Sequence, residues 1–159
     1  FKKLRKDSDL NELSRLVFMK GDKLETYYDT AYNDFKYLQS IKSVIPTIGS
    51  YNPIAVTAQN IAERFLKHVI QIYLLDRDYT SVLRSHKLIT LYQAIHEVYP
   101  DFQLDKNMLR VLTDYYFDAR YPGADYITVS QQEALEAVEI VEAVKYTVDS
   151  FIKRHPAKP

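Results

Sequence analysis

The chain has 159 residues, of which 47% are hydrophobic and 26% are charged, a composition typical of one soluble globular domain. Its 21 basic side chains balance its 21 acidic ones, so no overall charge favours nucleic acid or an anionic membrane. Cysteine is absent, which excludes disulfides and thiolate metal sites and fits a reducing compartment, so we expect a cytoplasmic protein. No run approaches the roughly 20 apolar residues of a membrane-spanning helix.

Two helices are predicted before residue 50. The first spans about Asp9 to Lys20 and begins with the capping-box pattern of Asp9 and Glu12. The second spans about Asp22 to Val44, where apolar side chains recur every three or four positions. Pro46 then interrupts the pattern.

The third helix is predicted to open at Asn52-Pro53, because proline is well tolerated at the first helical position. Its apolar stripe is broad enough for the central helix of a bundle and consists of Ala58, Ile61, Ala62, Phe65, Leu66, Val69, Ile72 and Tyr73. Residues 76–85 form a polar connector. A fourth helix follows from about His86 to Val98 and is stopped by Pro100.

The fifth helix is predicted over about Asp105 to Ala119, and the segment RYPGADYITV at residues 120–129 forms its exit loop. Ser130 and Glu133 make a second capping box, from which the last helix extends to about Lys153. The connections are short enough to place neighbouring helices antiparallel.

The predicted fold class is therefore all-α: an up-and-down antiparallel helical bundle of four to five core helices plus N-terminal helices. We expect residues 1–50 to be an N-terminal helical extension packed on the bundle. Residues 51–155 form the bundle itself, and residues 156–159 form a frayed tail.

Motifs for metals and common cofactors are not found. The four histidines show no i,i+4 pairing with one another, and three glycines cannot supply a phosphate-binding or dinucleotide-binding loop. We therefore predict no metal site and no cofactor, although a nucleotide ligand remains compatible with the sequence.

Three local features carry potential chemistry, and each also has a structural explanation. Glu63 and Lys67 are spaced as a helix-stabilising pair, worth about 0.2–0.5 kcal/mol. His86 precedes the fourth helix, where it serves either as an N-terminal cap element or as a ligand donor. Arg120 follows the fifth helix, whose C-terminus attracts cations, and Tyr121-Pro122 then stops the helix.

Taken in order, these features resemble the motifs of HEPN domains, the helical domains that often accompany minimal nucleotidyltransferases. Ala62-Glu63-x-x-Leu66-Lys67 resembles the first motif of the family, and His86-x-Leu88 resembles its His-Asp-Leu, with Lys87 in place of the usual Asp. The segment from Tyr116 to Pro122 resembles the exit motif Tyr-x-x-x-Arg-Tyr-Pro. The resemblance covers about Pro53 to Ile152.

The resemblance implies a helical bundle that commonly forms a homodimer, with a groove that accepts a nucleotide or RNA. It also implies a minimal nucleotidyltransferase partner, either another chain or a domain preceding Phe1, in a toxin–antitoxin-like or nucleotide-transfer system. Catalytic members are ribonucleases with a histidine four to six residues after an arginine. Arg120 is instead followed by YPGADY. We therefore favour a non-catalytic module, with a dimeric metal-independent RNase and a purely structural dimerisation module as the alternatives.

The predicted ligand-binding residues, carried over by this resemblance, are Glu63, Lys67, His86, Tyr116, Arg120, Tyr121 and Pro122. A phosphate would suit Arg120, Lys67 and His86, which offer a planar fork of donors, a point charge and a switchable donor. The rings of Tyr115, Tyr116 and Tyr121 are candidates for stacking on a base. The alternative is an ion pair between Glu63 and Arg120 that ties the exit loop to the central helix.

Overall fold

The computed structural model describes residues 25–156, so the helix predicted over about Asp9 to Lys20 lies outside the described part. Within residues 25–156 all regular structure is helical and no strand is present, which confirms the all-α prediction. The elements are α2 (Tyr27–Ile41), η1 (Lys42–Val44), α3 (Ile45–Ile48), α4 (Asn52–Tyr73), α5 (Thr80–Leu83), α6 (Leu88–Val98), α7 (Lys106–Asp118) and α8 (Gln131–Arg154).

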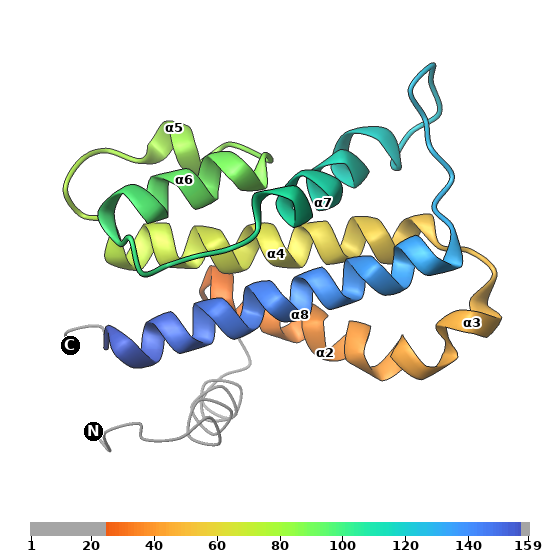
Figure 1. The fold of residues 1–159 in the computed structure, drawn as a ribbon, viewed down its shortest axis with the longest axis horizontal. Helices are drawn as coiled ribbons and strands as arrows, with labels where there is room; N and C mark the ends of the chain where they lie inside the picture. The colour runs from red at the N-terminus through yellow and green to blue at the C-terminus, as the bar shows by residue number, and fades with distance from the viewer. Residues whose placement is uncertain (1–24, 157–159) are drawn as a thin grey trace.

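Helix α4 is the centre of the bundle, as its broad apolar stripe predicts, and α2, α6, α7 and α8 all pack against it (Figure 1). The predicted all-α helical bundle is confirmed, and α2, α4, α7 and α8 alternate in direction. Helix α6 departs from the predicted antiparallel order, because it runs in the same direction as α4: His86 before it contacts Gln59, and Tyr99 after it contacts Tyr73. Helix α6 lies along the C-terminal half of α4, and α7 continues along its N-terminal half. The start of α6 therefore lies beside α7, whereas the end of α6 lies at the far end of α4, away from the start of α7.

The core is built mainly from apolar side chains of α4. Its residues Ile61, Phe65 and Leu66 are fully buried, and burying such a side chain contributes about 1.5–3 kcal/mol. Phe65 contacts Tyr28 of α2 edge-on, with ring centroids 5.3 Å apart. None of the helices from α2 to α8 combines the length and the apolar character that crossing a membrane requires.

One predicted helix cap, at Ser130, is confirmed, and the cap predicted at Asp9 lies outside the described residues. Ser130 accepts a hydrogen bond from the backbone of Glu133, and the Glu133 side chain accepts one from the backbone of Ser130. Asp105, which was not predicted as a cap, also caps α7: its side chain accepts hydrogen bonds from the backbone of Asn107 and Met108. These caps satisfy backbone donors that have no partner within the helix itself, so they depend only on local sequence.

Two predictions near the ends of helices were wrong. Helix α2 begins at Tyr27 and not near Asp22, because Thr26 and Asp29 form a reciprocal capping box that sets its start. Residues 76–85 are not a plain connector: they contain α5, preceded by Tyr79, whose ring is buried in the core. A helix of four residues has too little periodicity to be recognised from sequence, and packing stabilises it here.

Candidate functional site

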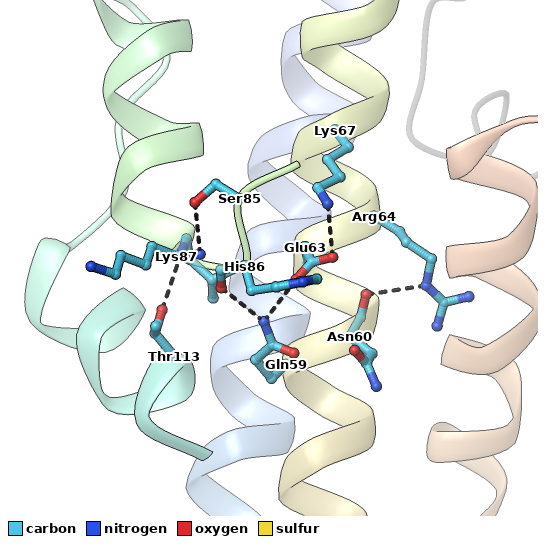
Figure 2. A network of polar contacts seen from close by, with 10 residues as sticks. Gln59, Asn60, Glu63, Arg64, Lys67, Ser85, His86, Lys87 and Thr113 are labelled. Atoms are coloured by element: carbon cyan, nitrogen blue, oxygen red, sulfur yellow. Dashed lines mark hydrogen bonds and ion pairs between the residues drawn. The ribbon is translucent and has the colours of Figure 1, made fainter. Parts of the chain in front are cut away.

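Glu63 is the centre of a polar cluster on the face of α4 that meets α6 (Figure 2). Lys67 Nζ donates to Glu63 Oε2 at 3.0 Å, one turn further along the helix. Gln59 Nε2 donates to Glu63 Oε1 at 3.1 Å from one turn before. All three residues are buried. The i,i+4 spacing therefore places one carboxylate between two donors inside the bundle.

His86 completes this cluster from outside α4. Its imidazole Nδ1 lies 3.0 Å from Glu63 Oε1, and its backbone carbonyl accepts a hydrogen bond from Gln59 at 3.2 Å. Because an ionised carboxylate only accepts hydrogen bonds, Nδ1 carries the hydrogen in this contact. The His86 side chain is 43% exposed. Its Nε2, which has no partner among residues 25–156, is therefore the ring nitrogen available to a ligand.

The amide of Gln59 has only one sensible orientation. Its Nε2 donates to two acceptors, the Glu63 carboxylate and the His86 carbonyl. If the amide nitrogen and oxygen were exchanged, the Gln59 oxygen would face both acceptors and neither contact would contain a donor. Its Oε1 is buried and has no hydrogen-bond partner in the described part of the chain. Leaving such an acceptor unsatisfied costs about 1–3 kcal/mol, so the cluster positions His86 at some expense of stability.

Helix α7 supports the other side of His86. The imidazole stacks on the ring of Tyr116, with centroids 4.2 Å apart and planes 18° from parallel. One turn before Tyr116, Thr113 Oγ1 accepts a hydrogen bond from the backbone of Leu88 at 3.1 Å. This bond caps α6, whose N-cap residue Lys87 makes no side-chain capping bond. A tertiary contact thus supplies a cap that the local sequence lacks.

Arg120 lies just beyond the end of α7, over the same aromatic group. Its guanidinium carbon is 4.5 Å from the ring centroid of Tyr116 and 5.3 Å from that of Tyr121. Arg120 is exposed, and it forms no ion pair with any residue between 25 and 156. The alternative ion pair between Glu63 and Arg120 is therefore not present: Glu63 is occupied by Lys67 and His86.

Asn52, the first residue of α4, holds the exit loop that carries Arg120. Its Nδ2 donates to the carbonyls of Ala119 and Ile127 at 3.1 and 2.8 Å, and its Oδ1 accepts from the backbone of Val129 at 2.7 Å. Nδ2 also lies 3.0 Å from the hydroxyl of Tyr126. One side chain thus ties both ends of the loop to the central helix.

The predicted site residues divide into three groups. Glu63, His86, Tyr116 and Arg120 form a continuous line of contacts, and Tyr121 joins it through Arg120. Lys67 lies at the buried end of this line, where its Nζ donates to Glu63 and orients the carboxylate. Pro122 is exposed in the loop and only continues the backbone away from α7.

One stacking candidate is excluded by its burial. The ring of Tyr115 is 3% exposed and packs in the core, so no base can reach it. Burial raises the pKa of Tyr115 to about 12, with smaller contributions from the charges of Glu133, Glu136 and Asp114. Tyr115 and Tyr116 are adjacent, and helical rotation directs one into the bundle and the other to His86.

Gln59, Asn52 and Thr113 were not among the predicted site residues. A signal for Gln59 does exist, because residues 59, 63 and 67 recur every four positions on one helix face. Asn52 and Thr113 act on residues distant in sequence. Nothing in their local sequence indicates these contacts.

Comparison with known proteins gives one family. A family model described as HEPN domain matches residues 35–151, which is most of the chain. The match includes every residue of the Glu63–Arg120 line and extends beyond the motif resemblance into α2. The searches of curated proteins and of solved structures returned no match.

Proposed function

The chain belongs to the HEPN domain family, and from this premise we propose that it is a non-catalytic module that binds the phosphate of a nucleotide or of RNA beside Arg120 and His86. Family membership indicates a role related to nucleotides or RNA. The proposal for this chain rests on the geometry of its own residues.

The proposal rests mainly on the surroundings of Arg120, which leave its guanidinium exposed and without a carboxylate partner among residues 25–156. A guanidinium offers a planar fork of donors that matches phosphate oxygens, but only when no carboxylate already occupies it. Arg120 is exposed, is free of ion pairs within the described residues, and is oriented by Tyr116 and Tyr121. Its charge is thus directed to the surface, where an anion can reach it.

When its imidazole carries a hydrogen on both nitrogens, His86 adds a second donor to the same place. Glu63 accepts from Nδ1, which leaves Nε2 to point away from α4, and Tyr116 contacts both the imidazole and the guanidinium. The buried charges of Lys67 and Glu63 compensate one another. Arg120, joined by His86 whenever its imidazole carries both hydrogens, then supplies the positive charge that supports phosphate binding at this surface.

The implied partners belong to the same proposal. We propose that the module acts as a homodimer together with a minimal nucleotidyltransferase, supplied as another chain or as a neighbouring domain. A domain that presents phosphate-binding groups would fit a nucleotide-transfer or toxin–antitoxin-like system. We propose that the nucleotidyltransferase contacts the module at the surface around Arg120.

Titration calorimetry with ATP and short RNAs tests the binding proposal. We expect Arg120→Ala to weaken the Kd about 10- to 100-fold, because a hydrogen bond to a charged group contributes about 1.5–3 kcal/mol. Arg110→Ala is the matched control, since Arg110 is also exposed and lies on α7. If wild type binds no probe, or if Arg120→Ala binds as wild type does, the proposal is wrong.

One observation favours a second candidate, metal-independent RNA cleavage by a dimer. The family arginine–histidine spacing is missing, but His86 and Arg120 contact the same tyrosine ring from different parts of the chain. An imidazole can exchange a proton while a guanidinium stabilises phosphate charge. RNA cleavage in the presence of EDTA that is lost in both His86→Ala and Arg120→Ala would support this candidate. Intact RNA and normal growth of expressing cells would count against it.

A purely structural dimerisation module makes a different prediction for the same variant. Arg120→Ala would then lower the melting temperature or weaken self-association while wild type shows no ligand affinity. Sedimentation equilibrium beside the calorimetry separates this outcome from phosphate binding.

A further inference from the structure

Tyr121 has the most exposed aromatic ring beside Arg120. Its side chain is 69% exposed, whereas Tyr115 is buried and Tyr116 is stacked on His86. The guanidinium of Arg120 lies between the rings of Tyr116 and Tyr121 and contacts both. Of Tyr115, Tyr116 and Tyr121, only Tyr121 therefore combines an accessible ring with a neighbouring cation.

We infer that Tyr121 is a stacking platform for an unpaired nucleobase whose phosphate is bound by Arg120. This inference rests on the proposed phosphate site and narrows its ligand. The preferred ligand would then be a nucleotide or single-stranded RNA. Free phosphate, sugar phosphates and duplex RNA would bind less tightly, because none of them offers an unpaired base to the ring. A base inside a duplex is already stacked on both faces and cannot cover the ring.

The chemistry of the pair suits such a ligand better than a general apolar contact. Stacking a base on an aromatic side chain contributes about 1–3 kcal/mol and tolerates any base, because every base has a π-face. An arginine beside the ring adds a planar cation that binds the phosphate of the same nucleotide.

The loop that carries Tyr121 is also well positioned before binding. Asn52 bonds the carbonyls of Ala119 and Ile127, and the backbone of Ile127 donates to the carbonyl of Asp118 at 2.8 Å. These contacts close the loop at its base. Holding the platform in place before the ligand arrives reduces the entropy lost on binding.

The test uses the full chain and four phosphate probes: ribose 5-phosphate, AMP, a single-stranded hexaribonucleotide, and the same hexaribonucleotide in a duplex. Variants are Tyr121→Ala, Tyr121→Phe and Tyr146→Ala. Tyr146 is the matched control, because its side chain on α8 is 68% exposed. Arg120→Ala reports on the phosphate contact in every titration.

We expect Tyr121→Ala to weaken the Kd for AMP and for the single strand about 5- to 100-fold. The Kd for ribose 5-phosphate should stay unchanged, and duplex should bind less tightly than single strand. Tyr121→Phe and Tyr146→Ala should behave as wild type. If Tyr121→Ala loses more affinity for the hexaribonucleotide than for AMP, RNA is the source of the base. If it loses the same affinity for both, the ligand is a mononucleotide.

Two failures can be told apart. If Arg120→Ala weakens ribose 5-phosphate binding while Tyr121→Ala leaves AMP binding unchanged, the platform is wrong and the phosphate site stands. If wild type binds none of the probes, the phosphate site and the platform both fail. Loss of self-association in Tyr121→Ala, with unchanged AMP binding, would overturn the platform by assigning the ring to an interface between copies.

Discussion

The imidazole Nδ1 of His86 lies 3.0 Å from Oε1 of Glu63, a residue of the central helix that is itself bound by Lys67. This relationship joins a loop residue to the core of the bundle. It also decides which nitrogen of His86 faces a ligand. Two of the predictions below follow from it directly.

The first prediction concerns the buried ion pair. Glu63→Gln removes the charge that compensates Lys67, and both side chains are about nine-tenths buried. We expect a loss of about 3–5 kcal/mol in the free energy of unfolding, because a buried charge is left without its partner. Urea denaturation monitored by circular dichroism measures this loss.

Two comparisons control that experiment. The double variant Glu63→Leu, Lys67→Met should lose less stability than Glu63→Gln, because it removes both charges. Glu97→Gln breaks the exposed pair between Arg77 and Glu97 and should cost less than about 1 kcal/mol. Equal losses in Glu63→Gln and Glu97→Gln would show that burial of the pair contributes nothing.

The second prediction concerns the tautomer of His86. Glu63 should hold the neutral imidazole with hydrogen on Nδ1, which nitrogen-15 NMR of the ring detects directly. His96, whose Nδ1 lies 2.8 Å from the carbonyl of Phe102, should show the same tautomer. In Glu63→Ala, His86 should lose this preference and His96 should keep it. A neutral imidazole of His86 that carries its hydrogen on Nε2 and none on Nδ1 in wild type would contradict the proposed orientation.

The third prediction concerns Asn52 and the exit loop. Asn52→Ala removes the bonds to Ala119, Ile127 and Val129. We expect it to cost about 2–4 kcal/mol, since three backbone groups lose their partner. Hydrogen exchange across residues 119–129 should accelerate, and AMP should bind more weakly. Asn33→Ala, which alters only an exposed contact to Asp34, should change neither quantity.

The fourth prediction concerns pH and His68, which faces α2 on another part of α4. Its ring lies edge-on to Tyr28, and its Nδ1 is buried without a hydrogen-bond partner in the part of the chain described here. Burial lowers the pKa of His68 from 6.5 to about 4, and the charge of Asp29 opposes that shift only partly. The unfolded chain therefore takes up a proton near pH 6.5, whereas the folded chain does so only near pH 4.

Stability is consequently lost as the pH falls from about 6.5 to about 4 and is fully present above that window. Over this window we expect wild type to lose up to about 3 kcal/mol more than His68→Phe. Urea denaturation at a series of pH values measures the free energy of unfolding of both proteins, which share every other titratable group. Parallel stability curves would show that His68 is not the group responsible.

Much of the fold was predictable because it depends on short-range patterns. The stripe of α4 predicted the central helix, and the Ser130–Glu133 pattern predicted the start of α8. The start of α2 was not predicted correctly, because Thr26 and Asp29 form a cap inside a segment whose apolar periodicity begins earlier. The start of α6 was predicted close to its observed position at Leu88, but its cap was out of reach, since that cap comes from Thr113 on another helix.

The sequence by itself determined the all-α class, the central position of α4 and the order of the motifs at Glu63, His86 and Arg120. Helical periodicity and local capping are properties of neighbouring residues, so a single chain displays them without its neighbours in space. Only the tertiary structure decided that Glu63 pairs with His86 and leaves Arg120 free, and that Tyr121 is the exposed ring. Those outcomes depend on how three helices and a loop pack together, which sets each side chain's partners and exposure.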